Sequence, residues 1–208
     1  TVESVASVAS AWNELRHCLK WNSPFILPAW LKVWWQEFGS GDELYLSVLR
    51  EGETVVGIAP LLVNEETASF IGSADICDYL DFIITPGREQ DFFNVLIDNL
   101  KLKGINKLDL GPLQPDSTVL THLVGIARNR GYEVLCHPED VSLELNLPPT
   151  WEEYLAMLNK KQRHEVRRKL RRLSEAGSVE HRFIEVRGEI EGYFNIFLKL
   201  FALSPDEK

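Results

Sequence analysis

The densest group of chemically competent residues is a basic run in the last third of the chain. Eight Lys and Arg residues and one acid, Glu165, lie between Lys160 and Arg172, so this run carries +7 although the whole chain carries -9. Guanidinium groups bind phosphate and carboxylate oxygens through paired hydrogen bonds, and Lys contributes a point charge. The run therefore predicts a localised anion site, or an internal partner surface, more than a protein coated for nucleic acid.

Helical spacing divides this run into two neighbouring stripes. One stripe comprises Lys160, Arg163, Arg167 and Arg171, and the other comprises Lys161, Arg168 and Arg172. Like charges at this spacing repel one another, and a bound anion relieves that repulsion. Two interpretations stay open, a phosphate-bearing ligand held by Arg and a solvated helix packed on the acidic remainder. Binding of single-stranded nucleic acid is less favoured, because no aromatic residues alternate with the cations.

A second group of candidates lies in the segment SADICDYLDF, residues 73–82, at the start of a predicted strand. A carboxylate or a tyrosine here could act as a general base, and solvated turn acids are the alternative interpretation. We take Asp78, Tyr79 and Asp81 as the catalytic candidates.

Several familiar sites are missing from the sequence. The patterns GxGxxG, GxxxxGK[ST], HExxH, CxxC and GxSxG do not occur, so nucleotide-loop, metal and hydrolase chemistry have no candidate residues. No metal site is expected. Cys18, Cys77 and Cys136 are widely spaced and are expected to be reduced thiols in the core. No apolar run reaches a membrane span and no secretion signal opens the chain, so we expect a cytoplasmic protein.

The elements that must position these residues alternate between helical and strand patterns. Predicted helices cover 6–20, 29–38, 91–104 and 118–131, and predicted strands cover 44–50, 54–63, 68–72, 79–85, 107–113, 132–138 and 141–147. The Glu51-Gly52-Glu53 connection predicts a hairpin within an antiparallel meander. One face of the second helix carries Trp30, Trp34, Trp35 and Phe38. This face is either core packing or the wall of a ligand pocket.

The pair Pro148-Pro149 predicts a domain boundary, with one domain at 1–147 and the next beginning at 148. Thr150 is placed to cap one continuous basic helix of about seven turns, which runs to Gly177. A strand at 179–187 and a helix at 189–201 follow. A long helix, one strand and one helix cannot form a compact sheet domain. Residues 148–208 are therefore expected to open an incomplete second domain, or to lend a strand to the first.

The chain resembles a known family in four segments taken together. These are SPFILPAWLKVWWQEFG, LYLSVLREGETVVGIAPLLV, CDYLDF and LPPTWEEYLAMLNKKQRHEVRRKLRRL. In this order they are similar to CelD/BcsL-type acetyltransferases, relatives of the Fem-type peptidoglycan-bridge transferases in the acyl-CoA N-acyltransferase (GNAT) superfamily. The residues between Trp151 and Leu173 are the most specific part of the resemblance.

The resemblance implies two tandem GNAT-like domains, of which this chain holds the N-terminal portion. The expected fold is α+β or α/β, with a mixed, mostly antiparallel sheet flanked by helices. A family pyrophosphate loop would lie at TPGREQD, residues 85–91, where one glycine and one proline leave the first domain degenerate for acyl-CoA.

The resemblance implies acyl transfer from acyl-CoA to an amine acceptor. Acyl-CoA (acetyl-CoA) would be the co-substrate of the full-length protein, and the expected setting is polysaccharide or cell-envelope biosynthesis. The chain alone is expected to be inactive. An anionic acceptor would bind through Lys160, Lys161, Arg163 and Arg167. The alternative is a non-catalytic GNAT-like module that binds a partner protein or nucleic acid through the basic helix, although strong nucleic-acid binding is not expected.

Overall fold

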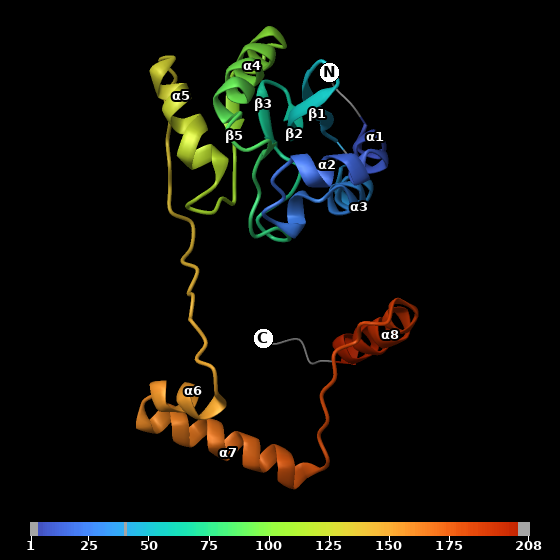
Figure 1. The fold of residues 1–208 in the computed structure, drawn as a ribbon, viewed down its shortest axis with the longest axis vertical. Coiled ribbons are helices and arrows are strands. Elements are labelled where there is room, and N and C mark those ends of the chain that lie inside the picture. The colour runs from blue at the N-terminus through green and yellow to red at the C-terminus, as the bar shows by residue number, and fades with distance from the viewer. Residues whose placement is uncertain (1–3, 40, 204–208) are drawn as a thin grey trace. The chain divides into compact units, whose positions relative to one another are not determined.

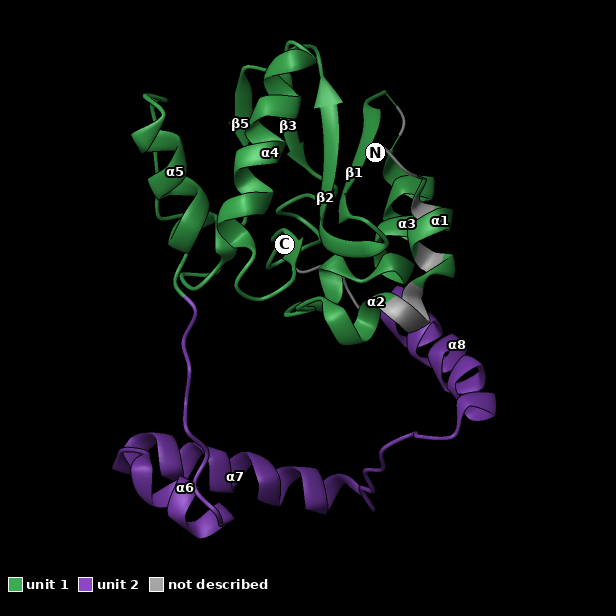
Figure 2. Ribbon diagram, turned by 45° about the horizontal axis from the view of Figure 1, so that its top comes forward, with its two compact units in different colours: residues 1–141 green, residues 142–208 purple. Residues whose placement is uncertain are grey.

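The computed structural model describes residues 4–39 and 41–203. The chain divides into two compact units, residues 1–141 and residues 142–208, which Figure 2 distinguishes by colour. Each unit is described separately below.

The first unit is built on one sheet that is mostly antiparallel (Figure 1). Its strands are β1 (Glu43–Glu51), β2 (Thr54–Asn64), β3 (Thr67–Phe70), β4 (Ile83–Ile84) and β5 (Lys107–Asp109). The strand order is β1-β2-β3-β5. Strand β4 pairs with residues 57–58 of β2, whereas β3 pairs with residues 61–64 of the same strand. All pairs are antiparallel except β3 with β5. This confirms the predicted mixed, mostly antiparallel sheet.

Strand β2 is the centre of this sheet. Residues 55–62 are buried without interruption, as is typical of a strand covered on both faces. The predicted hairpin to β1 is confirmed, and Gly52 in its turn has a φ of 58°, which a glycine adopts without steric cost. Gly57 in β2 permits close packing, since a Cβ there would lie 2.6 Å from the Phe92 ring.

Helices flank the sheet. They are α1 (Val5–Ser10), α2 (Trp12–Cys18), the 3-10 turn η1 (Pro24–Ile26), α3 (Pro28–Phe38), α4 (Glu89–Leu102), the π-helical turn η2 (Val119–Leu123) and α5 (Val124–Asn129). Helices α1 to α3 group beside β1, and α4 lies beside β3 and β5 (Figure 2). The predicted single helix over 6–20 is wrong, because Ala11, with φ -83° and ψ 5°, separates α1 from α2.

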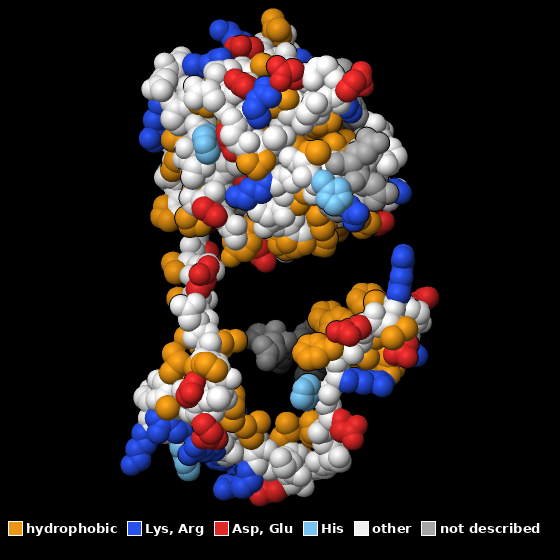
Figure 3. All heavy atoms as spheres, viewed as in Figure 1, with side chains coloured by type: hydrophobic (Ala, Val, Ile, Leu, Met, Phe, Trp, Pro, Cys, Tyr) orange, Lys and Arg blue, Asp and Glu red, His pale blue; other side chains and the backbone are white. Residues whose placement is uncertain are grey.

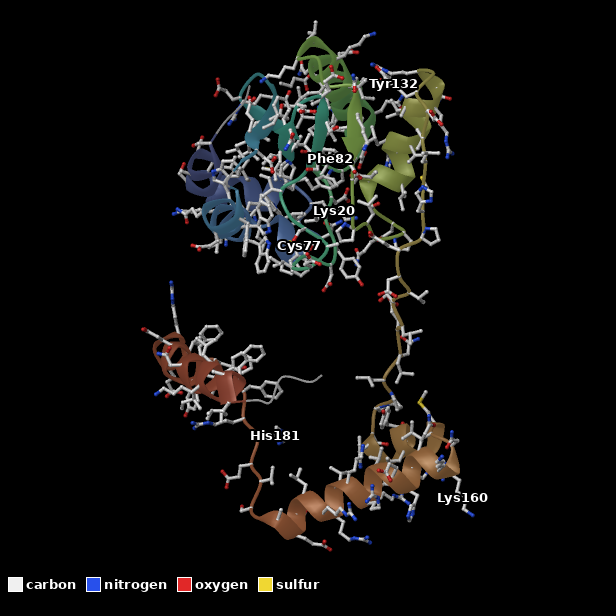
Figure 4. All side chains as sticks on the ribbon, turned by 180° about the vertical axis from the view of Figure 1, so that it is seen from behind. Lys20, Cys77, Phe82, Tyr132, Lys160 and His181 are labelled. Carbon is white, nitrogen blue, oxygen red and sulfur yellow. The ribbon has the colours of Figure 1, made fainter. Side chains whose placement is uncertain are left out.

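A cluster of four phenylalanines joins α4 to the sheet. Phe82 lies inside the first unit (Figure 4), with ring centroids 4.9 Å from Phe70, 5.8 Å from Phe92 and 5.3 Å from Phe93. The rings meet edge to face, an arrangement that aromatic quadrupoles favour. The loop that precedes β4 is therefore fixed to the core immediately beside Asp81.

The aromatic face of α3 is mainly core. Trp34 is 7% exposed, Trp30 and Trp35 are half-buried against the core, and Phe38 at the end of the helix is 52% exposed. Core packing is therefore correct for the tryptophans and wrong for Phe38.

Three predicted strands do not form. Residues 132–138, 141–147 and 179–187 belong to no strand or helix apart from the first residue of the last helix. Alternating apolar residues of the second segment, Val141, Leu143, Leu145 and Leu147, are all exposed. A strand requires a hydrogen-bonded neighbour, and none of the described strands pairs with these segments. The alternation of apolar and polar residues predicted strands here, but a sequence pattern alone does not provide a second strand to pair with.

The cysteine prediction is also partly wrong. Only Cys77 is buried, whereas Cys18 and Cys136 are exposed, and all three are unpaired thiols. Cys18 closes the short helix α2, and Cys136 lies in the segment that forms no strand, so neither is enclosed by packed elements.

The described residues of the second unit, 142–203, form three helices. They are α6 (Trp151–Met157), α7 (Lys160–Ala176) and α8 (Arg187–Leu203). The Thr150 cap is confirmed, since its hydroxyl accepts a hydrogen bond from the Glu153 amide. The continuous basic helix is wrong, because extended backbone at Leu158 and Asn159 divides it. Within the described part of this unit only Leu155 is a buried apolar residue.

We expect Trp34→Ala to lower the free energy of unfolding of the first unit by ~3–5 kcal/mol, because it removes a buried ring and leaves a cavity. Urea denaturation followed by circular dichroism measures this change. The matched control is Val33→Ala on the exposed side of the same helix, where Val33 is 58% exposed. Equal stability of the two variants would contradict a core role for Trp34.

Candidate functional site

The structure separates the three catalytic candidates by environment. Asp78 is exposed, Tyr79 is half-buried and Asp81 is buried. Tyr79 and Asp81 lie beside Asn22, Gln114 and Ser117, but these side chains enclose a cavity volume of about 0 Å³. Ligand pockets usually enclose ~300–1,000 Å³, so an acceptor molecule has no room here.

Asp81 is fully engaged by its neighbours. Its Oδ2 accepts hydrogen bonds from the Thr118 amide at 2.8 Å and from Asn22 Nδ2 at 3.4 Å. Its Oδ1 accepts from the Thr118 hydroxyl at 2.6 Å and from the Phe82 amide at 2.9 Å. The carboxylate thus satisfies the Thr118 N–H at the start of the η2–α5 segment, where the Ser117 hydroxyl accepts from the Leu120 amide, and both side chains act as helix caps. A proton acceptor for catalysis would have to abandon these bonds.

The basic residues sit on a helix whose start is sharply defined. Asn159 Oδ1 accepts from the Gln162 amide at 2.9 Å, and Gln162 Oε1 accepts from the Asn159 amide at 3.2 Å. This reciprocal capping box begins α7 independently of α6.

Arg163 links α7 back to α6. Its Nε donates to the Leu155 carbonyl at 2.7 Å, and its Nη2 donates to the carbonyls of Ala156 at 3.2 Å and Leu158 at 2.8 Å. The last carbonyls of a helix have no partners inside it, and a cation there also opposes the negative helix end. Arg163 therefore caps α6, and its donors are directed to backbone.

The other three substrate-binding candidates, Lys160, Lys161 and Arg167, differ from one another. Arg167 pairs with Glu152 of α6 at 3.2 Å. Lys160 and Lys161 are exposed and form no ion pair with any residue between 41 and 203. Figure 4 shows Lys160 at the end of α7 where that helix begins. Of the four substrate-binding candidates, Arg163 and Arg167 hold the helix pair together while the two lysines are available to solvent.

The second stripe retains more of its charge. Glu165 accepts from Arg168 at 2.5 and 2.9 Å and lies 3.9 Å from Lys169 Nζ. Hydrogen bonds from Arg168 hold the pKa of Glu165 below its ordinary value, and the charges of Lys169 and Arg172 act in the same direction. Arg172 forms no ion pair with the described carboxylates. The helical spacing of Lys161, Arg168 and Arg172 indicates this face in the sequence, but the predicted substrate-binding residues include only Lys161 from it.

The start of α4, where the resemblance places a pyrophosphate loop, is surrounded by carboxylates. Glu89 Oε1 accepts from the Gly87 amide at 3.2 Å, and Arg88 pairs with Glu51 and Asp91, both at 2.9 Å. The hydrogen bond to Glu51 is the main cause that raises the pKa of Arg88. A helix start attracts anions through free amides, and here the first turn carries the carboxylates of Glu89 and Asp91, of which Glu89 accepts from the Gly87 amide just before the helix.

Residues 4–39 and 41–203 contain no group of three or more His, Cys, Asp or Glu side chains that could hold a metal ion. None of their helices combines the length and the apolar character that crossing a bilayer requires.

Comparison with family models, with curated proteins and with solved structures finds no match to this chain.

We expect Asp81→Asn to destabilise the first unit by ~1.5–3 kcal/mol. Each carboxylate oxygen accepts from a backbone amide, so either orientation of the new amide directs an NH2 group at an N–H donor. Urea denaturation tests this, with Asp78→Asn as an exposed control that changes stability by less than about 0.5 kcal/mol. A stable Asp81→Asn protein would show that the cap is dispensable and would reopen a catalytic role.

We expect Arg163→Lys to loosen α6, since a lysine keeps the charge but cannot direct paired donors at several carbonyls. Amide hydrogen exchange across residues 151–157 should become about tenfold faster, which corresponds to ~1.4 kcal/mol. Lys161→Ala on the same helix serves as the control and leaves that exchange unchanged. Unaltered protection in Arg163→Lys would mean that contacts other than the guanidinium hold α6.

Proposed function

We propose that this chain is part of an acyl-CoA-dependent N-acyltransferase in which α7 binds an anionic amine acceptor. The observation that carries the proposal is the set of cations on α7 without a carboxylate partner among the described residues, namely Lys160, Lys161 and Arg172. In Figure 3 blue Lys and Arg side chains gather over the α6–α7 helix pair. Such a cluster attracts phosphate or carboxylate groups.

The reaction class is supported by the resemblance of the sequence together with the observed order of elements. The antiparallel β1–β2–β3 meander, α4, β5 and the η2–α5 segment follow one another in the expected order, whereas the two strands expected after them, at 132–138 and 141–147, do not form. In this reaction a deprotonated amine attacks the thioester carbonyl, backbone amides stabilise the oxyanion, and CoA leaves.

In this proposal the first unit does not supply the acyl-CoA site. Carboxylates of Glu89 and Asp91 lie at the start of α4, and the Gly87 amide is already bonded to Glu89. A pyrophosphate would meet negative charge there. The proposed contribution of this chain is therefore to hold the acceptor, with the acyl donor bound outside residues 85–91.

The second candidate function is a non-catalytic module that binds a macromolecular partner through α7. The observation that favours it is the exposure of two apolar side chains on the same helix, Leu170 at 45% and Leu173 at 50%. Apolar side chains beside cations fit a protein surface better than a small anion does.

We expect the whole chain to bind inorganic pyrophosphate through α7 at ~150 mM salt, and the double variant Lys161→Ala/Arg172→Ala to bind it about tenfold more weakly, a loss of ~1.4 kcal/mol. Two-dimensional NMR follows α7 amides during the titration. Lys32→Ala on α3 is the control and leaves the affinity unchanged. A 20-base-pair DNA duplex should not bind with micromolar affinity at this salt, because the Debye length is only ~8 Å and the chain carries -9.

Micromolar binding of the duplex at that salt, together with no response to pyrophosphate, would contradict the acceptor proposal and support the binding module. Pyrophosphate shifts confined to residues 85–90 would contradict the assignment to α7.

A further inference from the structure

One stripe of α7, which we call the outer stripe, consists of Lys161, Glu165, Arg168 and Arg172. These residues are separated by four, three and four positions, so their side chains follow one line along the helix. The stripe holds three cations and one acid, and neither Lys161 nor Arg172 forms an ion pair with a described residue. Arg163 and Arg167 are occupied by α6, so the outer stripe is distinct from the side of α7 that contacts α6.

Glu165 is bound within this stripe as an external anion would be. Arg168 donates to both carboxylate oxygens, Nη2 to Oε1 at 2.5 Å and Nε to Oε2 at 2.9 Å. Paired donation of this kind is also how arginine binds a phosphate group. The Lys169 ammonium adds a further positive charge 3.9 Å from Oε1. The guanidinium that is best placed to bind a phosphate on this stripe therefore already holds a carboxylate.

More positive than negative charge lies along α7 near the Glu165 carboxylate. Lys161 lies four residues before Glu165, and Arg168, Lys169 and Arg172 lie three, four and seven residues after it. Two cations, Arg168 and Lys169, thus lie within ion-pair distance of one monoanion, and Lys161 and Arg172 add positive charge about one turn before it and two turns after it. A phosphate group carries about -1.5 to -2 at neutral pH and offers three acceptor oxygens, so it neutralises more of this charge than the carboxylate does.

We propose that Glu165 is the resident anion of a phosphate-binding position on α7, and that a phosphate group binds there by displacing it from Arg168. This inference rests on the proposed function, since it names the chemical class of the acceptor's anionic group and the residue that limits its affinity. A monoanionic carboxylate ligand gains little by exchanging places with Glu165, whereas a phosphate gains charge and acceptors. The position therefore selects phosphate over carboxylate ligands.

The test titrates inorganic pyrophosphate and, separately, acetate into the whole chain and two variants, Glu165→Gln and Glu152→Gln. Both variants remove one negative charge, and Glu152→Gln frees Arg167 on the side of α7 that contacts α6. Breaking an exposed ion pair is worth about 0.2–1 kcal/mol, so Glu165→Gln should tighten pyrophosphate binding about threefold. Glu152→Gln should change it by less than about 1.5-fold, and acetate should respond only in Glu165→Gln. Circular dichroism verifies that both variants keep the helix.

Each outcome is decisive. Equal tightening in the two variants would reduce the effect to net charge and overturn the inference while leaving the proposed function standing. An unchanged affinity in Glu165→Gln, with binding by the wild-type chain, would do the same. Binding by Glu165→Gln alone would show that phosphate does not displace Glu165 from Arg168, and it would overturn the inference. No binding by any of the three proteins at ~10 mM pyrophosphate would overturn both the inference and the proposed anion site.

Discussion

Backbone groups left unpaired at helix ends determine what the charged side chains of this protein can do. Every α-helix leaves N–H groups free at its start and carbonyls free at its end, and these groups require partners when they lie in protein. Asp81 supplies acceptors at the start of the η2–α5 segment, and Arg163 supplies donors at the end of α6. A buried acid and a prominent arginine are both typical marks of function. In this protein both side chains stabilise helix ends.

Local features of the fold were predictable from the sequence. The β1–β2 hairpin, α3 with its Pro28 start and Gly39 end, and α4 follow from turn residues and periodicity within a few neighbouring positions. The break at Leu158 was not predicted, although Asn159 and Gln162 form a capping box that the sequence contains. The apolar spacing continues through the break, and continuity of that pattern outweighed the cap in the prediction.

Features that depend on distant contacts could not be read from one segment. Asp81 bonds Thr118 at a separation of 37 residues, so its role as a cap follows only from the folded arrangement. Strand patterns at 132–147 carry the alternation of a half-buried strand, but the hydrogen-bonded neighbour is a property of the sheet and not of the segment. The same holds for Cys18 and Cys136, whose exposure depends on which elements pack around them.

For the basic run, spacing on a helix identified the cations but could not tell which of them remain free. Because α7 begins at its own cap, α6 ends close enough for Arg163 and Arg167 to bond to it. These two arginines belong to the stripe that begins at Lys160, and neither is free to bind an anion. The charge that remains lies on the neighbouring stripe, where a single carboxylate is outnumbered. A two-residue interruption of the helix thus decides which side of α7 can receive an anion, because it converts part of a charge cluster into structure and leaves the rest available to a ligand.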